Sequence, residues 1–376
     1  MRRIVYTNTG RTGLHVSYFD PERGSLATVG RVADAPNAAF FEVHSSRRFL
    51  YAVNQLSSFK GKATGAVSAF AIDGATGELT HLNTVSSEGA EPCFAALDRR
   101  GKNLLVANYG GGSISIFPCS EPGYLAAASS SVTHYGSSIH PTRQSRAFPH
   151  SVRTSPDDRF VIVADLGMDR LIVYAFDPEQ GQLDRVPVHS HAMQSGAGPR
   201  HFVFHPAQPF AYVVNELNST ITVLSWDCIH GKFGDVQTVS ALPAGFDGEN
   251  LSAEICAHPN GRFLYASNRG HNSIAVFRIC PDGTVKLVQH VSSQGKSPRS
   301  FTLDPSGNYL FAVNQCGVMA VFTVNEESGR LEITDQRLEL DLPVCVRLME
   351  AVEDGERSRI GNSDELTRWN TQVHQR

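Results

Sequence analysis

Seven short segments of this chain share one pattern, an apolar run that closes on Asn or Asp. They are IVYTN, LYAVN, LLVAN, VIVAD, AYVVN, LYASN and LFAVN, which close on Asn8, Asn54, Asn108, Asp165, Asn215, Asn268 and Asn314. The steps between the closing residues are 46, 54, 57, 50, 53 and 46 residues. A recurrence of this length is too long for a helical solenoid and is typical of four-stranded propeller blades. The spacing therefore predicts an all-β fold, a seven-bladed β-propeller with antiparallel blades.

The repeat extends to both sides of each closing residue. In four segments a proline stands 16 residues before it, at Pro92, Pro149, Pro199 and Pro298. An alternating apolar run follows it, as in residues 170–176, and such alternation indicates a half-buried strand. We expect three clear strands per blade and a weaker outer strand, such as residues 79–85.

The two ends of the chain supply complementary strands. Residues 4–8 and 14–19 resemble the second and third strands of a blade, and residues 343–349 resemble a first strand with nothing after it. We infer that the two ends share one blade. This arrangement closes the ring and pairs strand edges that would otherwise be exposed.

We assign residues 1–351 to one propeller and residues 352–376 to a polar C-terminal tail, either an extension or a short surface helix. Residues 120–147 form a long connection rich in Ser, Ala and Gly. A connection of that length in a compact ring is usually functional or disordered.

Composition restricts the partners and the compartment. The net charge is −4 and 19% of residues are charged, which argues against a nucleic-acid or membrane partner. No run of 18 apolar residues exists and the first residues contain no apolar signal core, so we expect a cytoplasmic protein. The seven cysteines lack C-x-x-C spacing, and we expect buried reduced thiols.

If strands alternate in direction, every first strand begins and every second strand ends on one face of the ring. The reactive residues there are Cys93, His150, Arg200, His201, Glu254 and Arg299 where first strands begin, and Tyr109, Glu216 and Arg269 where second strands end. Arginine presents a fork of donors to carboxylate or phosphate, and histidine titrates near neutral pH. This face therefore predicts an anion-binding site with general acid and base groups.

Each of these residues also has a structural interpretation. The repeated Asn and Asp side chains can hold turns through hydrogen bonds to the backbone. Arg200 and Arg299 can form ion pairs with Glu254 and Glu216 that brace the ring. His150 can be a hydrogen-bonded histidine that lines a wet channel. A polar channel mouth is common to all propellers.

Three segments resemble a known family. Residues 196–224 (GAGPRHFVFHPAQPFAYVVNELNSTITVL), 251–277 and 106–117 are similar to the seven-bladed propeller lactonases. That family includes bacterial 6-phosphogluconolactonases and the fungal 3-carboxy-cis,cis-muconate lactonising enzyme. The resemblance implies a catalytic set of His150, Arg200, Glu216 and Arg269. Many relatives have a second histidine two residues before the first, where this chain has Phe148.

The resemblance implies hydrolysis of a small anionic lactone, most simply 6-phosphogluconolactone, without a cofactor or metal. Arginines would hold the phosphate or the oxyanion, and Glu216 or His150 would take a proton from water. The residues to which we assign substrate binding are His201, Glu254, Arg299, Tyr109, Asn108 and Asp165. We expect a monomer or a weak homo-oligomer. The chain has no G-x-S-x-G elbow, phosphate-binding loop, dinucleotide fingerprint or H-E-x-x-H motif.

Three alternatives remain at this point. A lactonising isomerase of the same fold would use the same arginines to bind carboxylates. A calcium-dependent lactonase would use oxygen ligands from Asn108, Asp165, Asn215 and Asn268. A non-catalytic binding platform is a third possibility, although the chain contains a single Trp-Asp pair, Trp226–Asp227.

Overall fold

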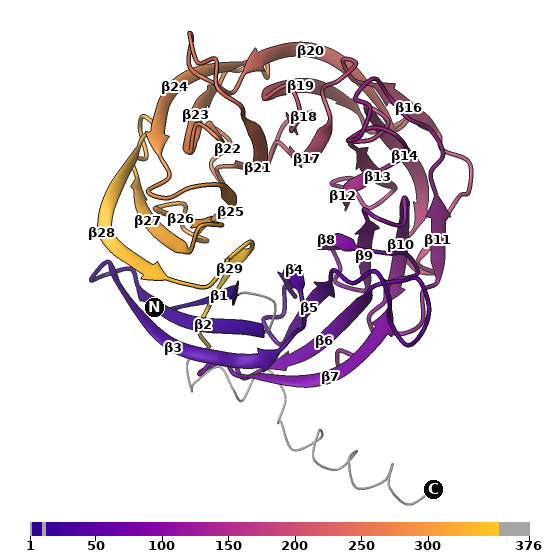
Figure 1. Cartoon of the computed structure of the whole chain (residues 1–376), viewed down its shortest axis with the longest axis horizontal. Coiled ribbons are helices and arrows are strands. Elements are labelled where there is room, and N and C mark those ends of the chain that lie inside the picture. Colours follow the sequence, from indigo (N-terminus) through magenta and orange to yellow (C-terminus); the bar gives the residue numbers. More distant parts are fainter. Residues whose placement is uncertain (1, 10–12, 353–376) are drawn as a thin grey trace, which may run out of the picture.

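Seven antiparallel sheets form a ring in the computed structural model, which describes residues 2–9 and 13–352 (Figure 1). Six sheets have four strands, and in the seventh the outer strand is divided into β15 and β16, which both pair with β14. The predicted seven-bladed β-propeller is therefore confirmed.

Each blade begins at the centre of the ring and runs outward. The inner strands are β4 (Ala38–Val43), β8 (Pro92–Leu97), β12 (Pro149–Thr154), β17 (Pro199–Phe204), β21 (Leu251–Ala257), β25 (Pro298–Leu303) and β29 (Val346–Glu350). The second strands are β5 (Phe49–Asn54), β9 (Asn103–Asn108), β13 (Phe160–Asp165), β18 (Phe210–Asn215), β22 (Phe263–Arg269), β26 (Tyr309–Asn314) and β1 (Arg3–Thr9).

The third strand of each blade is largely buried, and the outermost strand is the most exposed. The third strands are β6 (Ala66–Ile72), β10 (Ser113–Pro118), β14 (Arg170–Asp177), β19 (Thr220–Asp227), β23 (Ser273–Ile279), β27 (Val318–Val324) and β2 (Gly13–Asp20). The outer strands are β7 (Leu79–Ser86), β11 (Ser130–Thr133), β15 (Gln182–Leu183) with β16 (His189–Ala192), β20 (Lys232–Ser240), β24 (Val285–Ser292), β28 (Leu331–Glu339) and β3 (Ser25–Asp34).

The ends of the chain share a blade, as predicted. Its strand order is β29-β1-β2-β3, and Ile4 pairs with Met349. The inner strand begins at Val346 and not at residue 343, because the backbone N–H groups of Val344 and Cys345 donate to Oδ1 of Asn8, each at 2.9 Å. Past the strand, the N–H of Val352 donates to the carbonyl of Gly74 in the next blade. The rest of the predicted tail, residues 353–376, lies outside the described residues.

The apolar core lies between neighbouring blades. The alternating strands turn one apolar face to each neighbour, which is the reason that the sheets pack face to face. Four fully buried tyrosines, Tyr6, Tyr51, Tyr212 and Tyr265, occupy equivalent places in the second strands. The hydroxyl of Tyr6 donates to the carbonyl of Gly77 at 2.9 Å, and that of Tyr265 donates to Gly329 at 3.0 Å. These bonds fasten one blade to a turn of the next.

All seven cysteines are free thiols, but the expectation that all are buried is wrong. Cys93 and Cys345 are buried, whereas Cys228 and Cys316 are exposed. Cys228 directly follows β19 and Cys316 lies two residues after β26, both in turns at the surface of the ring. No helix in the described part of the chain is long and apolar enough to cross a membrane.

The long connection 120–147 contains the outer strand β11 and then a segment, residues 134–147, that returns toward β12. Three hydrogen bonds fasten this segment to the turn after β13. His134 Nδ1 lies 2.8 Å from Asp165 Oδ2, Ser138 donates to Asp169 at 2.6 Å, and Gln144 donates to the carbonyl of Leu166 at 2.9 Å. The returning segment is therefore an ordered part of the ring.

Candidate active site

A β-bulge near the start of the inner strands positions the reactive residues. In β12, Pro149 pairs with Asp165 and Ser151 with Ala164, which leaves His150 without a partner in the ladder. The same shift leaves Cys93, Arg200 and Arg299 unpaired in β8, β17 and β25. A bulge changes the direction of the extra residue and is common beside active sites. The residue after the proline is thus the one that the backbone itself directs away from the ladder.

Glu216 lies at the centre of a group of arginines. Its Oε2 is 2.8 Å from Arg200 Nε and 3.0 Å from Arg269 Nη2, and its Oε1 accepts a hydrogen bond from Arg143 Nη2. Glu216 follows β18, Arg200 is in β17, Arg269 ends β22 and Arg143 belongs to the returning segment. The carboxylate therefore joins parts of the chain from two blades and from the long connection.

Two of these arginines are also held by backbone carbonyls. Arg200 Nη1 donates to Ala253 at 2.7 Å, and Arg269 donates from Nε to Leu251 at 3.2 Å and from Nη2 to Ser252 at 3.3 Å. Such fixed donors require no rearrangement before they bind a developing charge.

The arginines determine the charge state of Glu216. Burial alone would raise the pKa of this carboxyl, but Arg269, Arg200 and Arg143 together lower the pKa to about 2. Glu216 is therefore a permanent anion at neutral pH. A carboxylate with so low a pKa is a weak proton acceptor.

Arg299 is the fourth arginine of this face and differs from the others. Within residues 2–9 and 13–352, no carboxylate lies within ion-pair distance of its guanidinium. Burial lowers its pKa, and the neighbouring Arg200 lowers it further. The structural interpretation of ion pairs that brace the ring holds for Arg200, which pairs with Glu216, whereas Arg299 pairs with neither carboxylate among the described residues.

His150 is a buried imidazole, 6% exposed, at the edge of the arginine group. Its ring centre lies 5.3 Å from that of His201 and 5.5 Å from that of Tyr109. Its Nδ1 is 3.9 Å from the sulfur of Cys93. Burial, and then the charge of Arg200, hold the pKa of His150 well below its usual value of 6.5. The ring is therefore neutral at pH 7.

A second layer lies one residue further along the inner strands. His201 Nδ1 is 2.7 Å from Glu254 Oε1, and Glu254 Oε2 accepts a hydrogen bond from Ser300 at 3.2 Å. The His201 ring packs against Phe94 with 4.9 Å between ring centres. Burial lowers the pKa of His201 to about 4, although Glu254 opposes this shift. The His201–Glu254 pair therefore lies directly beneath the layer that contains His150 and Arg200.

The wall beside His150 is aromatic. Tyr109 stacks on Phe148 with ring centres 4.7 Å apart, and the guanidinium of Arg146 lies 5.0 Å from the Phe148 ring. The position at which many relatives have a second histidine is thus occupied here by an apolar ring.

Asn108 and Asp165 have structural roles. Both are fully buried. Asn108 Nδ2 donates to the carbonyl of Ser87 at 3.0 Å, and Asp165 Oδ1 accepts from the N–H groups of Phe148 and Gly167 at 2.8 and 3.1 Å. The turn-holding interpretation accounts for these contacts.

The side chains of Asn215 and Asn268, which the calcium alternative would use as ligands, form hydrogen bonds within the ring. Asn215 Nδ2 donates to Thr220 and Thr222, each at 2.9 Å, and Asn268 Nδ2 donates to the carbonyl of Ala241 at 2.8 Å. The amide nitrogens of both side chains are thus used within the ring. No group of three or more His, Cys, Asp or Glu side chains among the described residues is arranged to hold a metal ion.

Sequence reasoning missed Arg143. It lies outside the repeat, and only the unusual length of residues 120–147 suggested that this connection was functional. The charge of Arg143 also acts on Tyr109, whose pKa is raised chiefly by burial.

Comparisons with known proteins identify related chains. The family described as "Lactonase, 7-bladed beta-propeller" matches residues 5–348. The 6-phosphogluconolactonase of Bacillus subtilis is 34% identical over 93% of this chain and 97% of the relative. The periplasmic gluconolactonase of Pseudomonas aeruginosa has a similar structure, with a TM-score of 0.86 at 29% identity over 94% of this chain and 100% of that one. A relative from Lactococcus lactis, 32% identical over 91% of this chain and 96% of its own length, is uncharacterized.

Proposed function

Because this chain belongs to the seven-bladed β-propeller lactonase family, we propose that it hydrolyses 6-phosphoglucono-δ-lactone to 6-phosphogluconate. The single observation that supports this substrate most strongly is the group of four arginines, three of which pair with one carboxylate, Glu216, while Arg299 does not. A doubly charged phosphate complements such a surplus of guanidinium groups. Relatives named 6-phosphogluconolactonase support the same choice.

Arg299 and Arg143 are the proposed phosphate ligands. Arg299 has no ion-pair partner among the described residues, so a phosphate does not have to displace one. The Arg143 side chain is 33% exposed, whereas that of Arg200 is 3% exposed. The two more deeply held arginines, Arg200 and Arg269, then remain for the lactone carbonyl.

His150 is the proposed general base. Glu216 is paired with three arginines and its pKa is about 2, which makes it a poor acceptor for a water proton. His150 is neutral and has no ion-pair partner within the described residues. Glu216 then serves to hold the arginines in place.

The proposed reaction balances as a hydrolysis. Water attacks the lactone carbonyl carbon while His150 takes its proton, and the oxyanion forms against Arg200 and Arg269. The bond from this carbon to the ring oxygen then breaks, and the protonated His150 returns the proton to that oxygen. The product is the hydroxy acid, and the enzyme is regenerated.

An anionic substrate would also adjust the base. In the free protein, burial and the charges of Arg200 and Arg299 lower the pKa of His150. A bound phosphate offsets part of this positive field and raises that pKa toward neutrality, where a general base is most effective. Binding of the substrate and activation of the base are thus linked.

The test is a rate assay of freshly generated 6-phosphoglucono-δ-lactone against its spontaneous hydrolysis. We expect clear acceleration, and weaker acceleration with glucono-δ-lactone. Faster enzymatic hydrolysis of glucono-δ-lactone would identify the unphosphorylated lactone as the substrate. No acceleration of either lactone, with turnover of 3-carboxy-cis,cis-muconate, would identify a lactonising isomerase. No turnover of any of the three by folded protein would leave a binding role.

A further inference from the structure

The inner strands form a third layer of side chains, on the far side of the His201–Glu254 pair from the candidate active site. It consists of the fifth residue of each inner strand, counted from the proline position. The members are Glu42, Ala96, Arg153, Val203, Cys256, Thr302 and Arg347. Because side chains alternate along a strand, this layer shares a direction with the layer of His201 and Glu254.

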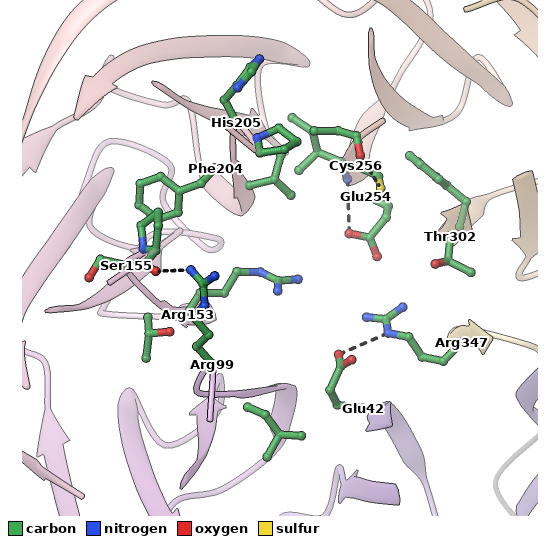
Figure 2. Close-up of a pocket in the computed structure, with 18 of the residues that line it drawn as sticks. Glu42, Arg99, Arg153, Ser155, Phe204, His205, Glu254, Cys256, Thr302 and Arg347 are labelled. Carbon is green, nitrogen blue, oxygen red and sulfur yellow. Dashed lines mark hydrogen bonds and ion pairs between the residues drawn. The ribbon is translucent and has the colours of Figure 1, made fainter. Parts of the chain in front are cut away.

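All members of the third layer except Ala96 line a cavity of about 650 Å³. Figure 2 shows Arg153 and Arg347 reaching into it from opposite walls, with Glu42 beside Arg347 and Glu254 beside the space between the two arginines. The cavity is therefore lined by two guanidinium groups that face each other.

Arg153 has no anionic partner there. No ion pair or hydrogen bond reaches its guanidinium from any residue in the ranges 2–9 and 13–352, and its Nε is buried without an acceptor. The ring of Phe94 lies under it, 5.1 Å from the guanidinium carbon. A buried guanidinium donor without an acceptor is costly, so this side chain favours an acceptor from outside the chain.

The two nearby carboxylates are already in use. Glu42 Oε2 lies 3.3 Å from Arg347 Nε. Glu254 accepts hydrogen bonds from Ser300 and from the N–H of Ile255 at 3.2 Å each, and pairs with His201. Arg347 Nη1 donates to the carbonyl of Val346 at 2.8 Å. Neither carboxylate forms an ion pair with Arg153.

We propose that this cavity is a second binding site, distinct from the candidate active site, for a small oxyanion held between the guanidinium groups of Arg153 and Arg347. The shared chemistry is that of phosphate, sulfate or a small dicarboxylate, each of which accepts the forked donors of arginine. Arg99, at the rim of the cavity, adds positive charge where the anion enters.

The experiment is calorimetric titration of wild-type protein, Arg153→Met and Arg299→Met with inorganic phosphate and, separately, with malonate. Arg299 belongs to the opposite face, so its substitution is the matched control for anions that bind there. We expect Arg153→Met to weaken anion binding at the third-layer site at least about tenfold and to leave lactone hydrolysis unchanged. Arg299→Met should bind anions at the third-layer site as tightly as wild-type protein does. The anion that binds more tightly, phosphate or malonate, identifies the preferred ligand group as phosphate or carboxylate.

Equal affinity of wild-type protein and Arg153→Met for both anions would overturn the proposal. A measurement on unaltered protein covers the case in which the variant does not fold. In crystals soaked with selenate, we expect an anomalous peak within hydrogen-bond distance of the Arg153 guanidinium. A peak at Arg299 alone, or no peak in the third layer, would equally contradict the site.

Discussion

The Nε of Arg200 lies 2.8 Å from Oε2 of Glu216, and each side chain is only 3% exposed. Removing one partner of such a buried ion pair is strongly destabilising, because the other charge is left buried and unpaired. Two further arginines share the same carboxylate. Glu216 is thus the anchor of the cationic face, which is consistent with the proposal that His150 takes the proton.

Replacing Arg143 with Met should raise the KM for 6-phosphoglucono-δ-lactone about tenfold, because one proposed phosphate ligand is lost. The kcat should change less, since Arg200 and Arg269 remain at the carbonyl. Steady-state kinetics measure both constants. Arg146→Met is the matched control, as Arg146 belongs to the same segment but stacks on Phe148. Equal KM values for the two variants would contradict the role of Arg143.

Replacing Arg299 with Met should separate recognition of the phosphate from recognition of the lactone ring. We expect kcat/KM for the phosphorylated lactone to fall at least about tenfold, because Arg299 is the cation without an ion-pair partner in the described structure. The kcat/KM for glucono-δ-lactone should stay within about twofold. A parallel loss with both substrates would instead place Arg299 at the reacting carbonyl.

The pKa of His150 should rise when an anion occupies the active site. Burial and Arg200 hold it well below 6.5 in the free protein, so the ring should be neutral at pH 6.5. Saturation with 6-phosphogluconate should shift the titration upward, because the phosphate offsets the arginine charges. NMR titration of the imidazole carbon-bound protons, assigned with His150→Gln, measures this. An unchanged titration with bound ligand would contradict the proposed link.

His201 makes the stability of the fold depend on pH. Burial lowers its folded pKa from 6.5 to about 4, so the unfolded chain binds a proton in this interval that the folded protein does not. Stability should therefore be complete above pH 6.5 and decrease as the pH falls toward 4. Glu254, with a pKa of about 2, contributes its own loss only below about pH 4.5.

Urea unfolding at pH 7 and pH 5 measures the His201 effect with little contribution from Glu254. Between pH 7 and pH 5, protonation of His201 should lower the free energy of unfolding of wild-type protein by on the order of 2 kcal/mol. His201→Gln should lose less stability between the two pH values than wild-type protein. His150→Gln should also reduce the dependence, since burial lowers the pKa of His150 in the same direction. The same pH dependence in His201→Gln as in wild-type protein would refute this assignment.

The ring and its closure could be predicted because they follow from local patterns. The apolar runs that close on Asn or Asp correspond to the second strands, and residues 343–349 contain the inner strand β29. The start of β29 could not be predicted, because it depends on the contact of Asn8 with Val344 and Cys345, 336 and 337 residues away. The burial of cysteines was predicted less well, since Cys228 and Cys316 lie in turns.

For the site, the ends of the strands identified most of the reactive residues, including His150, Arg200 and Glu216. The pairing within the site could not be predicted, because the bulges in β12, β17 and β25 decide where each side chain points. Arg143 was missed because the returning segment has no counterpart in other blades. Its place depends on tertiary contacts such as that of Gln144 with Leu166.

The most direct test of the account compares the hydrolysis of 6-phosphoglucono-δ-lactone by wild-type protein, His150→Gln and Arg153→Met. We expect His150→Gln to lose on the order of a hundredfold or more in kcat with a small change in KM, because a general base acts in the transition state. Arg153→Met, altered on the other side of the His201–Glu254 layer, should retain wild-type kcat. Wild-type kcat in folded His150→Gln would contradict the central claim that this face of the ring hydrolyses the lactone with His150 as its base.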